Sequence, residues 1–371
     1  MAMSSRVSCV IFEGGPSGSI IEDQMLSVRR AVVLDNLDKL LGSPDFDEVI
    51  LCTDNADLAS AAIELGAKVQ LTDSDFHFGR QLQDVINSHS LEKVLYMGGA
   101  SAPLIGSREL EEIAFRLRVR ENTVQVNNVQ SPDMVAFTPA NAVNFISPPP
   151  ADNQLGDRLR LQAGLTRLLI PNSPWINYDV DTPADLMILT FQERCGPRTS
   201  AALRALELDV SKFHRAAAIM LGHRTEVGLI GRVGAPIVKF INSNFRCRLR
   251  VMSEERGMKA LERDEPGKVA SFVGRLIDDI GPDRFFEYLA DTLDLAFFDT
   301  RVLFAHWQGR VSVADRYHSD LGQWRKIQHP QVRDLTRAAE ESDALVILGG
   351  HSLVYGGLWA FLQTLLPQKS P

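Results

Sequence analysis

Two carboxylates stand two residues apart in the segment 178–186, which reads YDVDTPADL. A strand presents residues i and i+2 on one face, so Asp179 and Asp181 are expected to point the same way. Thr182 precedes a proline, which is typical of a helix start, and Asp185 falls in the first turn of that helix. Open α/β sheets bind ligands at such strand ends. The pair is therefore predicted to hold a metal ion or a polar substrate, with a capped helix at a surface strand end as the alternative.

A glycine-rich turn follows the first apolar run, residues 7–12. A turn at the end of a first strand can hold phosphates with its backbone N–H groups, or it can simply reverse the chain. The residues predicted to contact a nucleotide in this turn are Gly14, Gly15, Ser17 and Gly18.

A second loop, 76–80, reads FHFGR and is expected to open a helix. Arg80 would then lie at a helix start, where anions gather, so it is a candidate contact for a base or a phosphate. The alternative is a pair of core aromatic side chains beside a solvated arginine.

Aspartate, histidine, arginine and serine gather in the segment 299–352. Such side chains could build a metal site or an acid–base site, although their spacings match no zinc motif and lone histidines are more often structural. The Gly-Gly-His-Ser turn at 349–352 is the predicted place for a bound anion. The candidates are Asp299, Arg301, His306, Asp315, His318, Asp320, His351 and Ser352.

Alternating strand and helix patterns must position these side chains. Strands are expected at 7–12, 48–53, 68–71, 93–97 and 133–138 in the first half, and at 226–231, 247–252, 295–298, 302–306 and 344–348 in the second. Helices are expected between them, among them 107–118 capped by Ser107 and 267–293 interrupted at Gly281-Pro282. This alternation is typical of βαβ units and a mainly parallel sheet. We place one domain boundary at 195–197, which gives domains 1–195 and 196–371.

The first strand with its glycine turn, the sequence GGASAPL at 98–104 and the DVDTPADL closure resemble the NTP-transferase family that includes molybdenum-cofactor and 2-phospho-lactate nucleotidyltransferases. The resemblance covers about residues 6–194. It implies a glycosyltransferase-A-like fold (nucleotide-diphospho-sugar transferase), a three-layer α/β sandwich with a mainly parallel sheet, followed by a second, smaller α/β domain. It also implies that a nucleotidyl group passes from an NTP to a small phosphorylated acceptor, with release of pyrophosphate.

In that family the glycine turn wraps the phosphates, a downstream basic residue supports them, and an aspartate in a D-x-P-L motif holds a divalent metal with the late aspartates. The resemblance therefore implies nucleotide contacts at Gly99 and Ser101 and catalysis by Arg29, with Arg30 as the other candidate for the phosphates. It further implies Mg²⁺ at Asp179 and Asp181, the second of which is also a catalytic candidate.

This chain has Ser101 where the family has its metal-binding aspartate. A hydroxyl is a poor replacement for a carboxylate on Mg²⁺. Two alternatives to a nucleotidyltransferase follow: a non-catalytic nucleotide- or nucleotide-sugar-binding protein with a degenerate transferase domain, or a glycosyltransferase.

The 371 residues carry a formal net charge of −8, which argues against nucleic acid as a partner, since phosphate-backbone binders carry clustered positive charge. The four cysteines are scattered without a C-x-x-C pair, which is typical of free thiols in a reducing compartment. No apolar run reaches the length of a membrane span, and residues 1–6 contain no signal-peptide core. A cytoplasmic protein that binds an NTP and a small-molecule acceptor is therefore expected.

Overall fold

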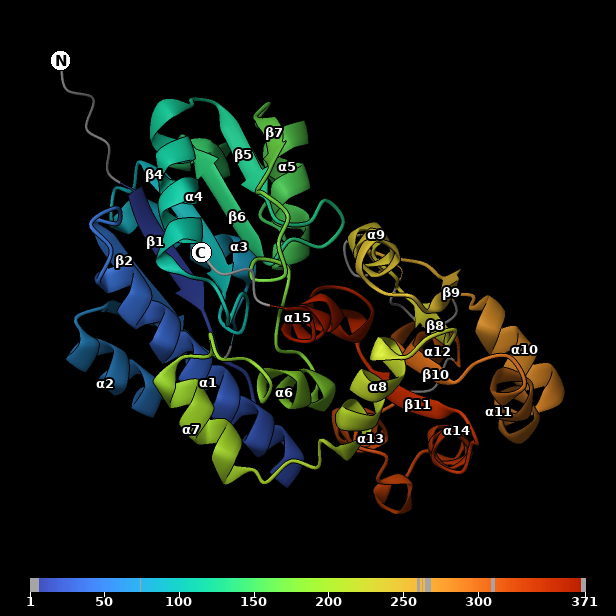
Figure 1. The fold of residues 1–371 in the computed structure, drawn as a ribbon. Helices are drawn as coiled ribbons and strands as arrows, with labels where there is room; N and C mark the ends of the chain where they lie inside the picture. Colours follow the sequence, from blue (N-terminus) through green and yellow to red (C-terminus); the bar gives the residue numbers. More distant parts are fainter. Residues whose placement is uncertain are drawn as a thin grey trace. The chain divides into compact units, whose positions relative to one another are not determined.

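The structure, a computed structural model, describes residues 7–73, 75–258, 261, 263, 268–307 and 311–367. The chain forms two compact units (Figure 1). The first comprises Met1–Pro16, Arg29–Asn177 and Gly196–Thr199, and the second comprises Ser17–Val28, Tyr178–Cys195 and Ser200–Pro371. The predicted helix start at Gly267 and the N-terminal residues 1–6 lie outside the described residues.

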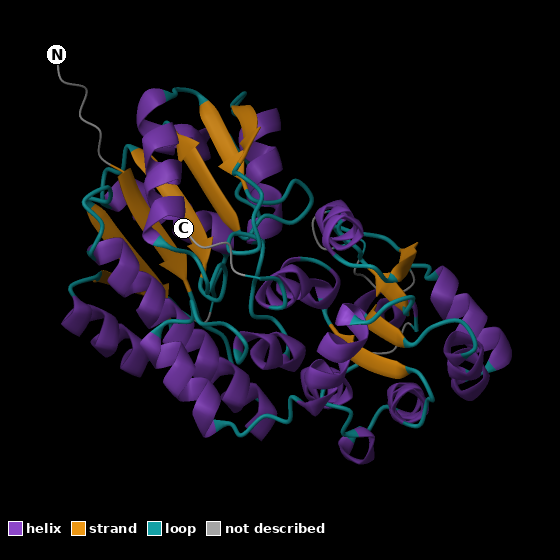
Figure 2. Ribbon diagram, in the orientation of Figure 1, coloured by secondary structure: helices purple, strands orange, loops and turns teal. Residues whose placement is uncertain are grey.

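Within the described ranges, the first unit contains a seven-stranded sheet in the order β3-β2-β1-β4-β6-β5-β7 (Figure 2). Strand β6 runs antiparallel to both of its neighbours, and the other pairs are parallel. The strands are β1 (Val7–Phe12), β2 (Glu48–Thr53), β3 (Lys68–Leu71), β4 (Lys93–Gly98), β5 (Thr123–Val126), β6 (Met134–Thr138) and β7 (Thr166–Leu169). This is the mainly parallel sheet that the sequence predicts.

Helices lie on both faces of this sheet. They are α1 (Ile20–Leu41, of which Ile20–Val28 belongs to the second unit), α2 (Ala56–Leu65), α3 (Phe78–Ser88), α4 (Ser107–Val119) and α5 (Leu155–Leu161), with the 3-10 turns η1 (Ala140–Phe145) and η2 (Asp152–Gln154).

Strand β1 is buried on both faces, and its alternate residues enter two separate cores. Val7, Cys9 and Ile11 pack with side chains of α1, α2 and α4. Val10 and Phe12 pack with side chains of α3 and α5 on the opposite face. The sheet therefore lies between two helical layers, which confirms the predicted three-layer sandwich. Burial on both faces also explains why β1 is apolar except for the small Ser8.

The segment Gly196–Thr199 is fastened to the first unit by Asp35 of α1. The buried Asp35 carboxylate accepts hydrogen bonds from Thr199 N at 2.8 Å and Thr199 Oγ1 at 2.7 Å. A Cβ on Gly196 would lie 2.2 Å from Asp35 Oδ2, so the close approach of the two segments requires glycine at this position.

In the part of the chain that is described, the second unit contains a four-stranded parallel sheet in the order β11-β10-β8-β9. Its strands are β8 (Glu226–Gly231), β9 (Arg248–Ser253), β10 (Leu295–Asp299) and β11 (Leu345–Gly349). The chain passes from β8 outward to β9 and then returns to the other side for β10 and β11. The strand order therefore reverses between β8 and β10, the point at which open α/β sheets place ligands.

The helices of the second unit follow the alternation that the sequence predicts. They are α6 (Pro183–Leu189), α7 (Pro197–Ala205, beginning in the first unit), α8 (Ser211–Leu221), α9 (Ala235–Asn244), α10 (Phe272–Ile280), α11 (Pro282–Ala290), α12 (Arg301–His306), α13 (Val313–Asp320), α14 (Pro330–Glu340) and α15 (Gly356–Thr364), with the 3-10 turns η3 (Trp324–Lys326) and η4 (His351–Val354). Gly281, at φ 81°, and Pro282 separate α10 from α11, as predicted.

Two local predictions are wrong. The segment 302–306, expected as a strand, is part of helix α12, because a short apolar run does not distinguish a buried helix turn from a buried strand. The cap of α4 is Gly106 rather than Ser107, and Glu109 accepts the bond from Gly106 N at 2.9 Å. Among the described helices, none has the length and apolar character needed to cross a bilayer.

Candidate functional site

A buried carboxylate, Glu13, occupies the carboxyl end of β1. Arg29 approaches it with two nitrogens: Nε donates to Oε1 at 3.1 Å and Nη2 donates to Oε2 at 3.0 Å. The Glu13 side chain is 1% exposed and that of Arg29 26% exposed. The guanidinium that the resemblance assigned to the nucleotide phosphates is therefore balanced by a carboxylate of the same unit.

The Glu13 side chain leaves room only for glycine at position 99. A Cβ at Gly99 would lie 2.2 Å from Glu13 Oε2 and 2.5 Å from Glu13 Cβ. Its backbone N–H donates to Phe12 O at 2.9 Å. The glycine at this position thus makes room for the carboxylate, which explains it without a ligand.

Carboxylates also take up backbone donors of the glycine turn. Gly15 N donates to Asp54 Oδ2 at 3.1 Å, and Asp54 Oδ1 would lie 2.5 Å from a Cβ at Gly14. On the part of the turn that belongs to the second unit, Gly18 N donates to Glu22 Oε2 at 3.0 Å. Ser17 Oγ donates to Ser19 O at 3.2 Å. Two N–H groups that a phosphate would use are thus bound to anions of the chain itself.

Ser101 is buried and engaged in backbone bonds. Its Oγ donates to Gly98 O at 2.7 Å, and its carbonyl accepts from Asn36 Nδ2 at 3.2 Å. These residues do not fit Mg²⁺, because the donor at the expected ligand position is a neutral hydroxyl already bound to a carbonyl. Across the described residues, no three Asp, Glu, His or Cys side chains converge in a way that would hold a metal ion.

Further carboxylates make this edge of the first sheet electronegative. Tyr96 Oη donates to Asp152 Oδ2 at 3.0 Å. Burial raises the pKa of Tyr96 well above its ordinary value, and the charges of Asp152, Asp133 and Glu13 raise it further. Strand ends β1 and β4 therefore present acceptors for hydroxyl and amino groups rather than an anion cradle.

The loop before α3 combines an aromatic side chain with a capping histidine. His77 accepts a bond from Arg80 N at 3.4 Å and caps the helix. Phe76 is 50% exposed and contacts the ring of Phe12 edge-on, with ring centroids 5.8 Å apart. The exposed Arg80 lies in the first turn of α3. The sequence singled out this loop through Arg80, with its two phenylalanines as core side chains in the alternative, whereas the Phe76 ring is accessible next to the end of β1.

Asp179 and Asp181 belong to the second unit, whereas Gly14, Gly15 and Ser101 belong to the first. The aspartates do not lie in an extended strand: Asp179 forms an isolated bridge, and Asp181 is exposed. The strand prediction for this segment is therefore wrong. Asp179 Oδ1 instead accepts a 2.6 Å bond from Ser352 Oγ, which fastens the segment to the turn after β11.

Asp185 completes a capping box at the start of α6, whose N-cap is Thr182. Its Oδ2 accepts bonds from Asp181 N at 3.0 Å, Thr182 N at 2.8 Å and Thr182 Oγ1 at 2.9 Å. Burial, followed by the charge of Asp181, raises the pKa of Asp185 to about 8. The capping explanation of this sequence is thus sufficient for Thr182 and Asp185.

The glycine pair after β11 accommodates α6. A Cβ on Gly349 would lie 2.9 Å from Ala184 Cβ, and one on Gly350 would lie 2.6 Å from Thr182 Cγ2. The two glycines therefore have a packing role, and the anion site predicted at 349–352 is not needed to explain them.

Asp299 and His351 do come together, at the carboxyl ends of β10 and β11. Asp299 pairs with Arg232, and His351 lies 3.3 Å from Arg256, measured between Nε2 and Nη2. Neither arginine was a candidate from the sequence, because a single arginine in a polar loop carries no periodic or spacing signal.

The remaining second-unit candidates separate into structural contacts. Arg301 forms a buried ion pair with Asp320. His306 Nε2 lies 3.1 Å from Asp278 Oδ2. Asp315 accepts from Gln328 N at 2.8 Å and His329 N at 3.1 Å. These contacts hold α12, α13 and the start of α14 in place.

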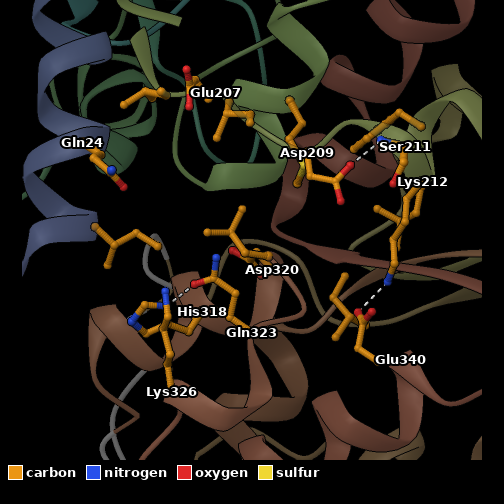
Figure 3. A pocket seen from close by; sticks show the side chains of 18 of the residues that line it. Gln24, Glu207, Asp209, Ser211, Lys212, His318, Asp320, Gln323, Lys326 and Glu340 are labelled. Carbon is orange, nitrogen blue, oxygen red and sulfur yellow. Dashed lines mark hydrogen bonds and ion pairs between the residues drawn. The ribbon is translucent and has the colours of Figure 1, made fainter. Parts of the chain in front are cut away.

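A pocket of about 890 Å³ lies within the second unit (Figure 3). It contains two of the predicted residues, His318 and Asp320, and His318 Nδ1 is 2.9 Å from Gln323 Oε1. Across the pocket, Lys212 is paired with Glu340. Of the acidic side chains in its wall, Glu340 is thus paired with Lys212, and Asp320 is paired with Arg301.

No family model matches the sequence, and no curated protein matches it. Solved structures are similar over about half of the chain. A cytidylyltransferase from Leptospira borgpetersenii serovar Hardjo-bovis has a TM-score of 0.41 and 14% identity, covering 54% of this chain and 94% of that chain. CMP:2-keto-3-deoxy-manno-octonic acid synthetase complexed with CTP has a TM-score of 0.38 and 18% identity, covering 55% and 100%. Glucosyl-3-phosphoglycerate synthase from Mycobacterium tuberculosis in complex with phosphoglyceric acid has a TM-score of 0.35 and 14% identity, covering 54% and 79%.

Proposed function

We propose that the first unit binds a nucleotide or a nucleotide-sugar through its base and sugar, and does so without a Mg²⁺-dependent transfer step. The observation that carries this proposal is the buried Glu13–Arg29 pair at the end of β1. The resemblance implies that the phosphates of an NTP lie at this strand end. The Glu13 carboxylate lies there instead, and it already neutralises the Arg29 guanidinium.

The topology supports a ligand at this edge of the sheet. From β1 the chain builds outward to β2 and β3 on one side, and β4 lies on the other. The strand order therefore reverses between β1 and β4, at whose carboxyl ends Glu13 and Gly99 meet.

The chemistry of the edge selects the neutral part of such a ligand. Carboxylates accept hydrogen bonds from ribose or sugar hydroxyls and from exocyclic amino groups, and they repel phosphates. Asp54 and Asp152 supply these acceptors, and the exposed ring of Phe76 supplies a stacking surface for a base.

The second candidate is nucleotidyl transfer from an NTP to a small phosphorylated acceptor. The position of Arg80 in the first turn of α3 favours it, since a helix start with a basic side chain attracts a phosphate. Glycosyl transfer from a nucleotide-sugar is a third candidate on the same strand order. The two transfer reactions differ from the binding proposal in their products and in their need for a metal.

Equilibrium titration of the full chain with each common NTP and nucleotide-sugar tests the proposal. We expect saturable binding of at least one of them, with a Kd that changes less than about twofold when Mg²⁺ is replaced by EDTA, and no pyrophosphate or sugar transfer with any acceptor. Mg²⁺-dependent release of pyrophosphate would overturn the proposal in favour of the second candidate, and the absence of binding by all ligands would overturn every candidate.

Phe76→Ala identifies the site. Loss of a stacking ring is worth about 1–3 kcal/mol per base, so affinity should fall by about fivefold or more. Phe115→Ala is the matched control, since Phe115 is 56% exposed on α4 and should leave the affinity unchanged. Equal losses in both variants would contradict a base stacked on Phe76.

A further inference from the structure

Basic side chains gather at the carboxyl edge of the second sheet, which belongs to the second unit. Arg232 follows β8, Arg256 lies in the loop after β9, and His351 follows β11. Asp299, at the end of β10, lies among them. The edge lies where the strand order reverses between β8 and β10.

The Asp299 carboxylate is fully engaged. It accepts from Arg232 Nε at 2.6 Å and Nη2 at 3.0 Å, and also from the backbone N–H groups of Arg232 and Arg301 at 3.2 Å each. The side chain of Asp299 is 0% exposed. Its side-chain hydrogen bonds therefore go to Arg232, and its charge acts on Arg256 without a hydrogen bond.

Arg256 is half-buried beside Arg232 and Tyr355. Its Cζ lies 5.2 Å from the centroid of the Tyr355 ring, and its Nη2 lies 3.3 Å from His351 Nε2. Burial lowers the pKa of Arg256, and the charge of Arg232 lowers it further. Burial and Arg232 outweigh the opposing effects of Tyr355 and Asp299, so the positive charge of Arg256 is only partly offset by its surroundings.

The two glutamates of the loop after β9 are bound to other partners, whereas the charge of Asp181 acts on His351. Glu254 accepts from Ser271 Oγ at 2.8 Å and caps α10, and Glu255 pairs with Arg263. His351 is neutral, because burial lowers its pKa to about 3, so its Nε2 accepts from Arg256 without balancing its charge. Among the described carboxylates, none forms an ion pair with Arg256.

The start of α9 adds backbone donors to this edge. Its N-cap is Gly234. This position requires glycine, because a Cβ there would lie 2.1 Å from the Tyr355 ring. Gly234 has no side chain that could accept from the first-turn N–H groups of α9, including that of Ala235. Tyr355 thus contacts both the uncapped helix start and the guanidinium of Arg256.

We propose that this edge binds the phosphoryl group of a small ligand, held by Arg256, by the outer face of Arg232 and by the N–H groups that begin α9. A tetrahedral dianion would satisfy the guanidinium and the helix donors together, and the positive end of the helix would stabilise it. A carboxylate offers fewer acceptors and one charge, so it should bind more weakly.

Titration of the full chain with inorganic phosphate, by calorimetry and by ³¹P line broadening, tests this site. We expect one saturable equivalent, competition by sulfate and weak binding of acetate. Arg256→Gln should weaken phosphate by about tenfold or more, which is the usual loss for a charge-assisted hydrogen bond. Arg246→Gln is the matched control, because Arg246 is exposed beyond the opposite end of α9.

Ala235→Pro provides a second test that leaves every side-chain charge in place. Proline is tolerated at the first helical position, so the variant removes one N–H donor without breaking α9. We expect a weaker phosphate affinity and an unchanged melting temperature without phosphate. No saturable phosphate binding by the natural chain, or equal affinity in Arg256→Gln and Arg246→Gln, would overturn the proposal, and so would an unchanged affinity in Ala235→Pro.

Discussion

Asp185 is expected to make the second unit less stable as the pH rises. Its pKa is about 8 in the folded chain, against an ordinary value of 3.8. Between these values the folded chain holds a proton that the unfolded chain has released. The free energy of unfolding therefore falls with rising pH, by about 1.4 kcal/mol per pH unit for this one group.

Asp185→Asn should abolish this dependence. An amide oxygen can accept the bonds that Oδ2 receives from Asp181 and Thr182, and it carries no charge. The stability of the variant should not change with pH through this group. Between pH 5 and pH 7 the natural chain should therefore lose up to about 3 kcal/mol relative to the variant.

Urea unfolding, monitored by tryptophan fluorescence, measures the free energy of unfolding of the second unit, to which Asp185 belongs. Trp175 belongs to the first unit, so a Trp175→Phe background leaves Trp307, Trp324 and Trp359 to report on the second. Asp279→Asn, at an exposed position of α10, controls for the loss of a carboxylate in general.

Two results would refute the reasoning. If Asp185→Asn and the natural chain show the same slope between pH 5 and pH 7, the carboxyl group does not hold a proton in the folded state. If the variant is less stable at pH 7, the cap requires an ionised carboxylate, and a loss of about 1 kcal/mol is then expected.

Two further substitutions test contacts described above. Gly99→Ala should destabilise the first unit by about 1–3 kcal/mol in urea unfolding, because the added Cβ meets Glu13. The control Gly18→Ala should change stability little, since a Cβ there would lie 3.7 Å from Glu22. Equal losses of stability in the two variants would contradict the packing argument. Arg301→Met should lower the free energy of unfolding of the second unit by about 3–5 kcal/mol, because it leaves the Asp320 charge buried and unpaired. Adding Asp320→Leu should restore much of that stability. A double variant no more stable than Arg301→Met would rule out charge burial as the cause.

The layers of the fold were predictable because they depend on local patterns. Burial makes β1 and β4 mostly apolar runs, and Gly281-Pro282 is a helix break whatever surrounds it. The four-residue strands β5 and β7 were missed, although β3, which has the same length, was predicted.

The candidate site was predictable only in outline. The glycines at the strand ends were found from the sequence, but their partners were not: Asp54 is 39 residues from Gly15, and Glu13 explains Gly99. The Asp179–Asp181 spacing suggested a strand face, yet capping by Asp185 and the bond to Ser352 determine that segment. These contacts join residues that are far apart in the sequence, and the spacing of residues along the chain does not predict them.

The division of the chain also bears on the order in which the protein is made. The first unit lacks the partner of Asp35 until Thr199 has been synthesised, so a fragment that stops at residue 195 would leave a buried carboxylate unsatisfied. Ser17–Val28 is synthesised before β2 to β7, but its unit is completed by the strands that follow them, β8 to β11. Neither unit can be released by a single cut, and the unit that holds the N-terminal half of α1 is incomplete until β8 to β11 have been synthesised.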